Sequence, residues 1–292
     1  MIGESWEVAD LPDNVASDTD DPRSRVSSGP LAGLSLREVI AAAGDELLGP
    51  VLPTSEGRFP LLVKLLDARE HLSVQVHPHE GYINDHPGTR LKTESWYVVD
   101  SEPGSVLFHG LASDSDLASV RRAIGTPAIV PHLRTVEAVP GSFHHVPAGL
   151  VHSLGAGVMV AEVQTPSDTT FRLYDWAEEY GRAPRQMHHE QGAAALVVHP
   201  EGADSLEPWP QLGVRSLIAN QHYWICEHRR GEGAFPLSDP PGPRVLMVMS
   251  GAAAVSGLLL KAGTTAIVPA CSLDTMVDVD AAAVYLEIGL AV

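Results

Sequence analysis

Short stretches of alternating apolar and polar residues, separated by glycine and proline, make up most of the chain. Examples are ESWYVVD (94–100), SVLFHGL (105–111), GVMVAEVQT (157–165) and RVLMVMSG (244–251). Many short strands with regular turn signals are typical of a sandwich or barrel. Helical patterns occur at 36–47, where Ser35 is the expected cap and Gly49 the stop, and at 115–124. We therefore expect a mainly β fold with a few short helices.

The segment LSVQVHP (72–78) predicts a strand with two chemically different faces. Successive side chains leave a strand on opposite sides, so Val74 and Val76 share an apolar face. Ser73, Gln75 and His77 share the other face. The strand ends at a proline, and its polar face could hold a metal ion.

A spacing of glycine, proline and histidine occurs once and then recurs in altered form. In PGSFHHVPAGLVHSLGAG (140–157) the spaced residues are Gly141, Pro147, Gly149 and His152. This spacing resembles the second motif of the cupin superfamily, a double-sheet jelly roll or double-stranded β-helix. In KAGTTAIVPACSLDTM (261–276) the corresponding residues are Gly263, Pro269, Cys271 and Asp274. We predict two cupin-like halves, a metal-binding catalytic domain (1–190) and a degenerate domain without a metal site (191–292).

Length, charge and cysteine content narrow the possible functions. A chain of 292 residues exceeds one average domain, which favours two. Its formal net charge of −18 argues against nucleic acid or an anionic membrane as partner. No run approaches the roughly 18 apolar residues of a spanning helix, and the acidic N-terminus lacks signal-peptide features, so we expect a cytoplasmic protein. Two cysteines are too few for a disulfide scaffold.

Four side chains far apart in the sequence could bind one divalent ion. They are Gln75, His77, Glu94 and His152. Imidazole nitrogen and carboxylate oxygen suit zinc, and this donor set would leave a centre of charge about +1 that attracts an anionic or oxygen-rich substrate. Each residue also has a simpler interpretation, such as a hydrogen-bonded strand histidine or a solvated glutamate.

Other histidines are left out of this ligand set. His144 and His145 are adjacent on one expected strand and point in opposite directions, so both cannot face one ion. The tract MHHEQ (187–191) is interpreted as a solvated loop within a loose connection that spans 177–213.

Several separate motifs, in order, resemble type I mannose-6-phosphate isomerases in their short bacterial form. They are GESWEV (3–8), FPLLVKLLDAREHLSVQVHP (59–78), KTESWYVVD (92–100) and VPAGLVHSLGAGVMVAEVQTPSDTTFRLYDW (146–176). Members of that family are zinc enzymes that interconvert mannose 6-phosphate and fructose 6-phosphate. The resemblance implies one zinc ion per chain on Gln75, His77, Glu94 and His152. It also places Lys92 and Arg172 in the active site.

Isomerisation through an enediol needs stabilisation of negative charge on the substrate oxygen, which zinc and the Arg172 guanidinium would supply. Lys92 could shuttle a proton or hold substrate oxygens, and Ser73 is a candidate phosphate contact or a hydroxyl bonded within the protein. Arg172 could instead pair with Asp175 or Asp168.

Two competing functions remain open at this stage. One is an iron-dependent cupin oxygenase, and the other is a non-catalytic sugar-binding cupin. The expected partner is a small sugar phosphate, and the chain is expected to be a monomer or a small homo-oligomer. The acidic segment YDWAEEYG (174–181) lacks the phosphate-binding lysine of larger relatives.

Overall fold

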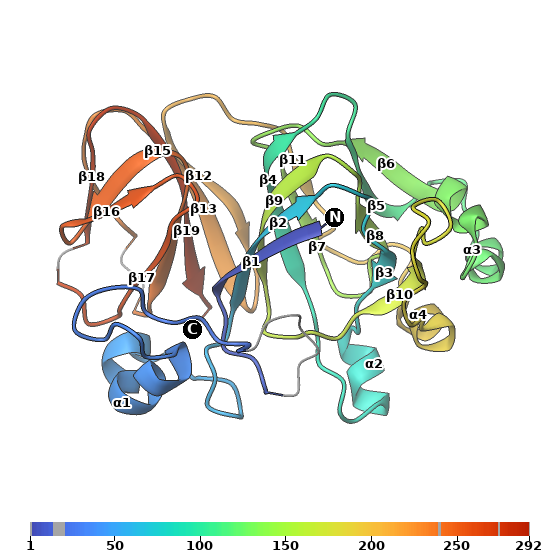
Figure 1. The fold of residues 1–292 in the computed structure, drawn as a ribbon, viewed down its shortest axis with the longest axis horizontal. Helices are drawn as coiled ribbons and strands as arrows, with labels where there is room; N and C mark the ends of the chain where they lie inside the picture. The colour runs from blue at the N-terminus through green and yellow to red at the C-terminus, as the bar shows by residue number, and fades with distance from the viewer. Residues whose placement is uncertain (1, 14–20, 239–240, 274, 292) are drawn as a thin grey trace. The chain divides into compact units, whose positions relative to one another are not determined.

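The computed structural model describes residues 2–13, 21–238, 241–273 and 275–291 (Figure 1). The chain forms two compact units, and each is built from two separate stretches of sequence. The first unit comprises Met1–Trp6 and Val63–Pro208, and the second comprises Glu7–Leu62 and Trp209–Val292. The predicted boundary near residue 190 thus lies inside the first unit, and residues 7–62 group with the C-terminal half.

Contacts of helix α1 (Leu36–Leu48) explain why residues 7–62 belong to the second unit. Backbone amides of Ala270 and Cys271 donate hydrogen bonds to carbonyls of Leu47 and Glu46 at 3.0 Å. The bonded residues lie more than 200 positions apart in the sequence. Such contacts cannot be predicted from the local sequence pattern.

The first unit contains two sheets. One has the strand order β1 (Ile2–Val8), β2 (Leu62–Ala68), β9 (Val158–Gln164), β4 (Glu94–Ser101), β7 (Phe143–Val146) and β11 (Ser205–Leu206). The other has the order β10 (Phe171–Tyr174), β3 (Val74–Val76), β8 (His152–Leu154), β5 (Val106–Leu111) and β6 (Leu133–Glu137). The prediction of a mainly β fold of the cupin type is confirmed, and its strands form curled antiparallel sheets.

Two apolar cores pack against opposite faces of the second sheet. One is shared by both sheets and includes Leu66, Trp96, Val98, Leu107 and Leu154. The other includes Val74 and Val76 from β3 and residues of the helical segments, such as Val120, Ile129 and Ala195. The apolar face predicted for residues 72–78 therefore packs beneath helices, and its polar face turns away from them.

The two predicted helices are confirmed. Ser35 caps α1 through a capping box with Glu38, and Gly49 at φ 59° ends it. The second prediction corresponds to α3 (Leu117–Ala123), capped by Asp116.

The sequence pattern missed three further helical segments, namely α2 (Glu80–Asp85), η1 (Pro127–His132) and α4 (His189–Ala195). The tract 187–191 is not a loop throughout, because α4 begins at His189, but the prediction that it is solvated is confirmed for the exposed residues 189–191. The wider stretch 177–213 also holds β11 and the first residue of β12, so it is more ordered than predicted. Among the described residues, no helix is long and apolar enough to cross a membrane.

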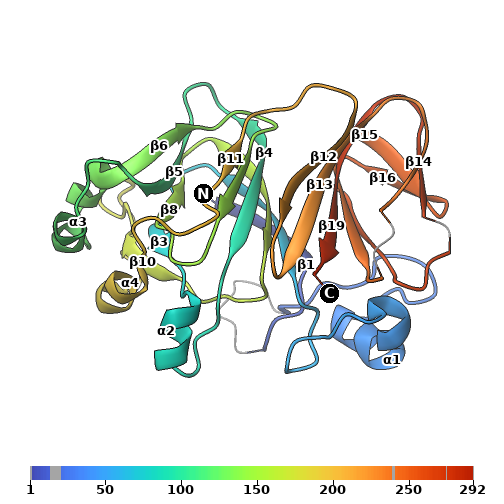
Figure 2. The same ribbon diagram turned by 180° about the vertical axis from the view of Figure 1, so that it is seen from behind.

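The second unit forms one sheet that curls around a separate core (Figure 2). Its strand order is β12 (Gly213–Ala219), β13 (Tyr223–Arg230), β19 (Ala283–Leu290), β15 (Arg244–Val255), β18 (Met276–Val279) and β14 (Gly233–Pro236), with β16 (Leu258–Lys261) and β17 (Thr265–Val268) also paired to β15.

The two predicted copies of the glycine-proline spacing adopt the same local structure. The backbone amide of Gly141 donates to the carbonyl of Val98 at 2.8 Å, and that of Gly263 donates to the carbonyl of Val248 at 2.8 Å. Both glycines have positive φ, 87° and 80°, a conformation that favours glycine. A four-residue strand follows each of them. Asp274, the last residue of the second copy, lies outside the described residues.

This correspondence identifies the residue of the second unit that matches Glu94. Glu94 pairs with Val146 across β4 and β7, and Arg244 pairs with Val268 across β15 and β17. Arg244 is buried and donates to the carbonyl of Ser238 at 2.9 Å. A guanidinium therefore stands where the first unit has a carboxylate.

Candidate metal centre

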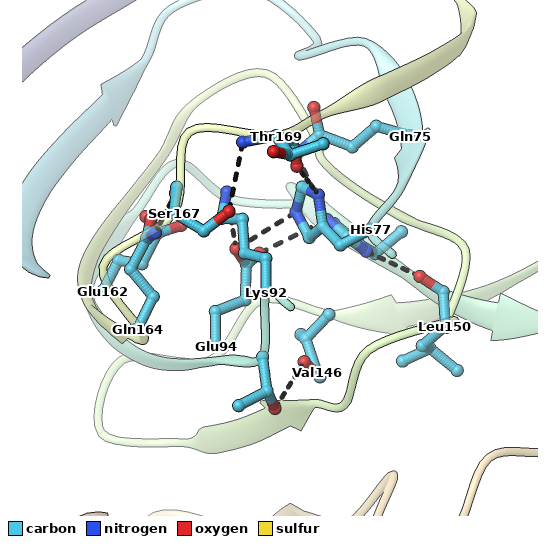
Figure 3. Close-up of polar contacts among 12 residues, drawn as sticks. Gln75, His77, Lys92, Glu94, Val146, Leu150, Glu162, Gln164, Ser167 and Thr169 are labelled. Carbon is cyan, nitrogen blue, oxygen red and sulfur yellow. Dashed lines mark hydrogen bonds and ion pairs between the residues drawn. The ribbon is translucent and has the colours of Figure 1, made fainter. Parts of the chain in front are cut away.

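Two imidazoles and one carboxylate converge in the first unit (Figure 3). The Nε2 atom of His77 lies 3.2 Å from Oε2 of Glu94, and the Nε2 atom of His152 lies 3.3 Å from Oε1. The three potential ligand atoms are all within 4.8 Å of one another, and each side chain is at most 1% exposed. This arrangement brings together three of the four predicted metal ligands.

Hydrogen bonds fix the orientation of both imidazoles. The Nδ1 atom of His152 is 2.8 Å from the carbonyl of Leu150, and that of His77 is 3.1 Å from the carbonyl of Thr169. A carbonyl oxygen only accepts, so Nδ1 carries the proton in each ring and Nε2 presents a lone pair. Both lone pairs are directed toward the Glu94 carboxylate.

The Nε2 atom of His77 and Oε1 of Glu94 are buried without a hydrogen-bond partner, and the contact of Glu94 Oε2 is an ion pair with the Lys92 ammonium at 3.0 Å. Buried polar atoms are almost always bonded, and facing lone pairs repel one another. A divalent cation between them would satisfy all of them at once, so the donor chemistry fits a metal of the zinc type.

Gln75, the fourth predicted ligand, lies directly opposite His152 in the pairing of β3 with β8. Its amide Nε2 donates to Nε2 of His152 at 3.1 Å, so in this structure the amide presents its N–H, not its oxygen, to that imidazole. The hydroxyl of Ser73 donates to Oε1 of Gln75 at 3.2 Å, which fixes the orientation of the amide. In this structure the buried Ser73 hydroxyl is bonded to a side chain, and its role as a phosphate contact stays a prediction.

Lys92 lies next to the three converging residues. Its Nζ atom is 3.0 Å from Oε2 of Glu94, and its side chain is 7% exposed. Burial alone would raise the pKa of Glu94, but the Lys92 ammonium holds that pKa well below its usual value. Burial lowers the pKa of His77 to about 3, and it also lowers the pKa of His152. Both rings are therefore neutral, as metal ligation requires.

Arg172 lies directly opposite Gln75 in the pairing of β10 with β3 and therefore shares its face. Among the residues that the structure describes, its guanidinium makes no ion pair. Asp175, the partner considered from the sequence, is paired with Arg182 and Arg185 instead. Burial lowers the pKa of Arg172, as expected for a half-buried cation without a counter-charge.

Sequence reasoning missed a buried carboxylate in the same region, Glu162. It lies opposite Trp96 in the pairing of β4 with β9, and Trp96 Nε1 donates to it at 3.2 Å. Lys64 is only 12% exposed and lies 3.5 Å from Glu162. Burial and the nearby Glu94 raise the pKa of Glu162. A charged residue inside the otherwise apolar stretch 158–163 was the signal that could have revealed it.

Comparisons with known proteins identify the relatives of this chain. Residues 3–102 match the family described as "Phosphomannose isomerase type I, catalytic domain". The mannose-6-phosphate isomerase of Streptococcus mutans is 35% identical over 212 residues, which span 72% of this chain and 62% of that protein. The Bacillus subtilis protein YvyI, which carries that name provisionally, is 32% identical over 76% of this chain and 68% of its own length.

The chain belongs to the type I phosphomannose isomerase family. The crystal structure of the mannose 6-phosphate isomerase from Bacillus subtilis has a TM-score of 0.75 at 25% identity, with 98% of this chain and 89% of that chain covered. A zinc-bound mannose 6-phosphate isomerase structure shares the fold, with a TM-score of 0.68 at 16% identity over 99% of this chain and 91% of that chain. The alignment to the Streptococcus mutans relative covers about three fifths of that relative's length.

His144 and His145 are buried, and their side-chain contacts are separate from those of the candidate metal ligands. His144 lies 2.9 Å from the hydroxyls of Ser142 and Ser205, and His145 lies 2.9 Å from that of Ser95. The two rings therefore contact different serines, consistent with their exclusion from the ligand set.

The Lys92 and Glu94 pair should stabilise the metal-free protein strongly. Breaking a buried ion pair leaves one uncompensated charge, so we expect Lys92→Met and Glu94→Gln each to cost about 3–5 kcal/mol in the free energy of unfolding. Because the two losses share one cause, the double variant should cost less than their sum by roughly 1–3 kcal/mol. Urea unfolding in the presence of chelator measures all four proteins. The exposed pair Arg69 and Asp67 is the matched control, expected to contribute under about 1 kcal/mol. Additive losses at Lys92 and Glu94 would contradict the pairing.

His144 should make the protein less stable in acid. Burial, with a smaller effect of Arg134, lowers its pKa to about 4, below the value of about 6.5 in an unfolded chain. Between pH 6.5 and pH 4 the unfolded chain binds a proton that the folded protein does not, so stability falls as pH falls. We expect the loss between pH 7 and pH 5 to be about 2 kcal/mol smaller in His144→Gln. Urea midpoints of the metal-free proteins test this, with His199→Gln at an exposed position as control. Equal pH dependence in the parent and His144→Gln would show that His144 titrates normally.

Proposed function

We propose that this chain is a metal-dependent aldose–ketose isomerase that interconverts mannose 6-phosphate and fructose 6-phosphate. The observation that carries the proposal is the convergence of buried lone pairs on His77, Glu94 and His152, which leaves a place for one cation. Family membership and relatives named mannose-6-phosphate isomerase support the choice of reaction.

The resident ion is proposed to be zinc, one per chain. Gln75, His77, Glu94 and His152 would hold it, and relatives of the same fold have been solved with zinc. The amide of Gln75 distinguishes this donor set from the histidine-rich sites of iron-dependent cupin oxygenases. When bound, the ion would act as a Lewis acid toward the carbonyl and hydroxyl oxygens of the sugar.

The protein's own cations would bind and orient the substrate. Moving a proton between C1 and C2 places negative charge on a substrate oxygen in the enediol stage, and fixed positive charge nearby stabilises it. Arg172 has a half-buried guanidinium without a carboxylate partner, on the face that also carries Gln75. Lys92, already held beside Glu94, would donate hydrogen bonds to substrate oxygens and keep the sugar in register.

Metal removal tests the proposal directly. We expect chelator to abolish conversion of mannose 6-phosphate in a coupled assay, and a stoichiometric amount of zinc to restore it, with one zinc per chain by elemental analysis. Glu94→Gln should bind no zinc under the same conditions. Full turnover by metal-free protein would reject the metal dependence, and oxygen consumption with Fe(II) in place of isomerisation would favour an oxygenase. Sugar-phosphate binding without turnover would indicate a non-catalytic role.

Replacement of Arg172 separates its role in turnover from a role in folding. Arg172→Ala should lower kcat by about 10²–10³-fold, because an electrostatic contact to the developing charge is lost. Its zinc content and urea midpoint should stay near those of the parent, since the guanidinium makes no ion pair that would be broken. Arg69→Ala, at an exposed position, is the control and should leave kcat unchanged. An unaltered kcat in Arg172→Ala would remove Arg172 from the mechanism.

A further inference from the structure

A separate cavity of about 530 Å³ lies in the first unit, at the end of the sheet where β5 pairs with β6. It is formed by the end of β5 and the residues that follow it, by the start of β6, and by the segment after α4. Its size falls in the range of small-molecule sites, which are about 300–1,000 Å³. None of its lining residues belongs to the candidate metal ligands.

The charge of this cavity is opposite to that of the chain as a whole. The protein has a formal net charge of −18, yet no aspartate or glutamate lines the cavity. Arg134 is its permanent cation, and exposed His199 also lines it. Leu111, Leu133 and Val198 contribute apolar surface. A lining that holds a permanent cation, apolar groups and no carboxylate favours an organic anion.

Arg134 is held in place before any ligand arrives. Its Nε atom donates to the carbonyl of His109 at 2.8 Å, and one terminal nitrogen lies 2.6 Å from Nδ1 of the same residue. A guanidinium only donates, so Nδ1 of His109 accepts and its Nε2 carries the proton. That proton is donated to the carbonyl of His145 at 2.8 Å. His109 is fully buried, so the whole arrangement is anchored in the interior.

The other terminal nitrogen of Arg134 is left for a ligand. Among the described residues it has no hydrogen-bond partner, and Arg134 forms no ion pair. A planar guanidinium fixed on one edge offers its remaining N–H groups in a set geometry, which suits the paired oxygens of carboxylate or phosphate. Pre-organisation also reduces the entropy lost on binding.

We propose that this cavity is a second binding site, specific for a small organic oxyanion. The shared chemistry is a phosphate monoester or carboxylate head that pairs with Arg134, with a short apolar portion against Leu111, Leu133 and Val198. His109 lies opposite the candidate ligand His152 in the pairing of β5 with β8. An anion bound to Arg134 would therefore lie close to β5, the strand next to β8, which carries the candidate ligand His152, and would not contact the metal ligands.

Calorimetric titration of the zinc-loaded protein tests the proposal with two probes, inorganic phosphate and propionate. We expect at least one probe to bind the parent protein, and Arg134→Gln to weaken that binding about ten- to hundredfold, the range for a charge-assisted pair. Arg172→Ala should retain it, because Arg172 belongs to the metal centre. Binding of phosphate alone would assign a phosphate monoester, and binding of propionate alone a carboxylate.

Arg134→Gln also removes the hydrogen bonds between Arg134 and His109, so a second variant is needed that leaves them in place. Ser113→Asp places a carboxylate in the cavity at an exposed position and leaves both bonds from Arg134 to His109 intact. It should weaken the same probe at least about tenfold, while Ser113→Asn should not. The proposal is overturned if neither probe binds, if Arg134→Gln and Ser113→Asp bind as the parent does, or if binding is lost only in Arg172→Ala.

Discussion

The buried negative charge of Glu94 is the constraint on which the rest of the first unit depends. A fully buried carboxylate is costly unless charge and hydrogen bonds compensate for it, and here one ammonium, Lys92, lies within 3.0 Å. The two nearest imidazoles present lone pairs, because each uses its N–H on a backbone carbonyl. The ammonium offsets the charge of Glu94, but the Nε2 lone pair of His77 has no hydrogen-bond donor as long as only protein atoms occupy the site. This arrangement of lone pairs favours a cation between the side chains.

The alternation of side chains along the strands, together with strand register, places the polar residues of the site on one face of the sheet. On β3, Val74 and Val76 belong to the core beneath the helices, which commits Gln75 to the opposite face. Register then places Arg172 on one side of Gln75 and His152 on the other, so a row of polar side chains crosses three strands. A slip of one residue would exchange the faces, burying amide and imidazole among apolar side chains. The same strand register is therefore needed both to pack the core that contains Val74 and Val76 and to assemble the candidate metal centre.

Features that depend on local pattern could be predicted from the sequence, and features that depend on distant contacts could not. The two faces of 72–78 follow from alternation, and the cap of α1 follows from Ser35 and Glu38. Glu162 was missed because a lone glutamate in a strand is ordinarily solvated, and only the pairing of β9 with β4 buries it. The membership of residues 7–62 in the second unit rests on backbone contacts with the C-terminal region. Convergence of the metal ligands was inferred from family resemblance, and strand register explains it physically.

The two units show how one backbone frame can carry different chemistry. Gly141 and Gly263 turn the chain in the same way, and Glu94 and Arg244 occupy matching positions in the register. An arginine has no lone pair for a metal and carries charge of the opposite sign, so Arg244 cannot take the role proposed for Glu94. Its buried guanidinium donates a hydrogen bond to the carbonyl of Ser238. The backbone bonds that define the frame involve no side chain. A single position can therefore change from carboxylate to guanidinium without altering the strands around it, which is why likeness of fold between the units carries no information about a shared function.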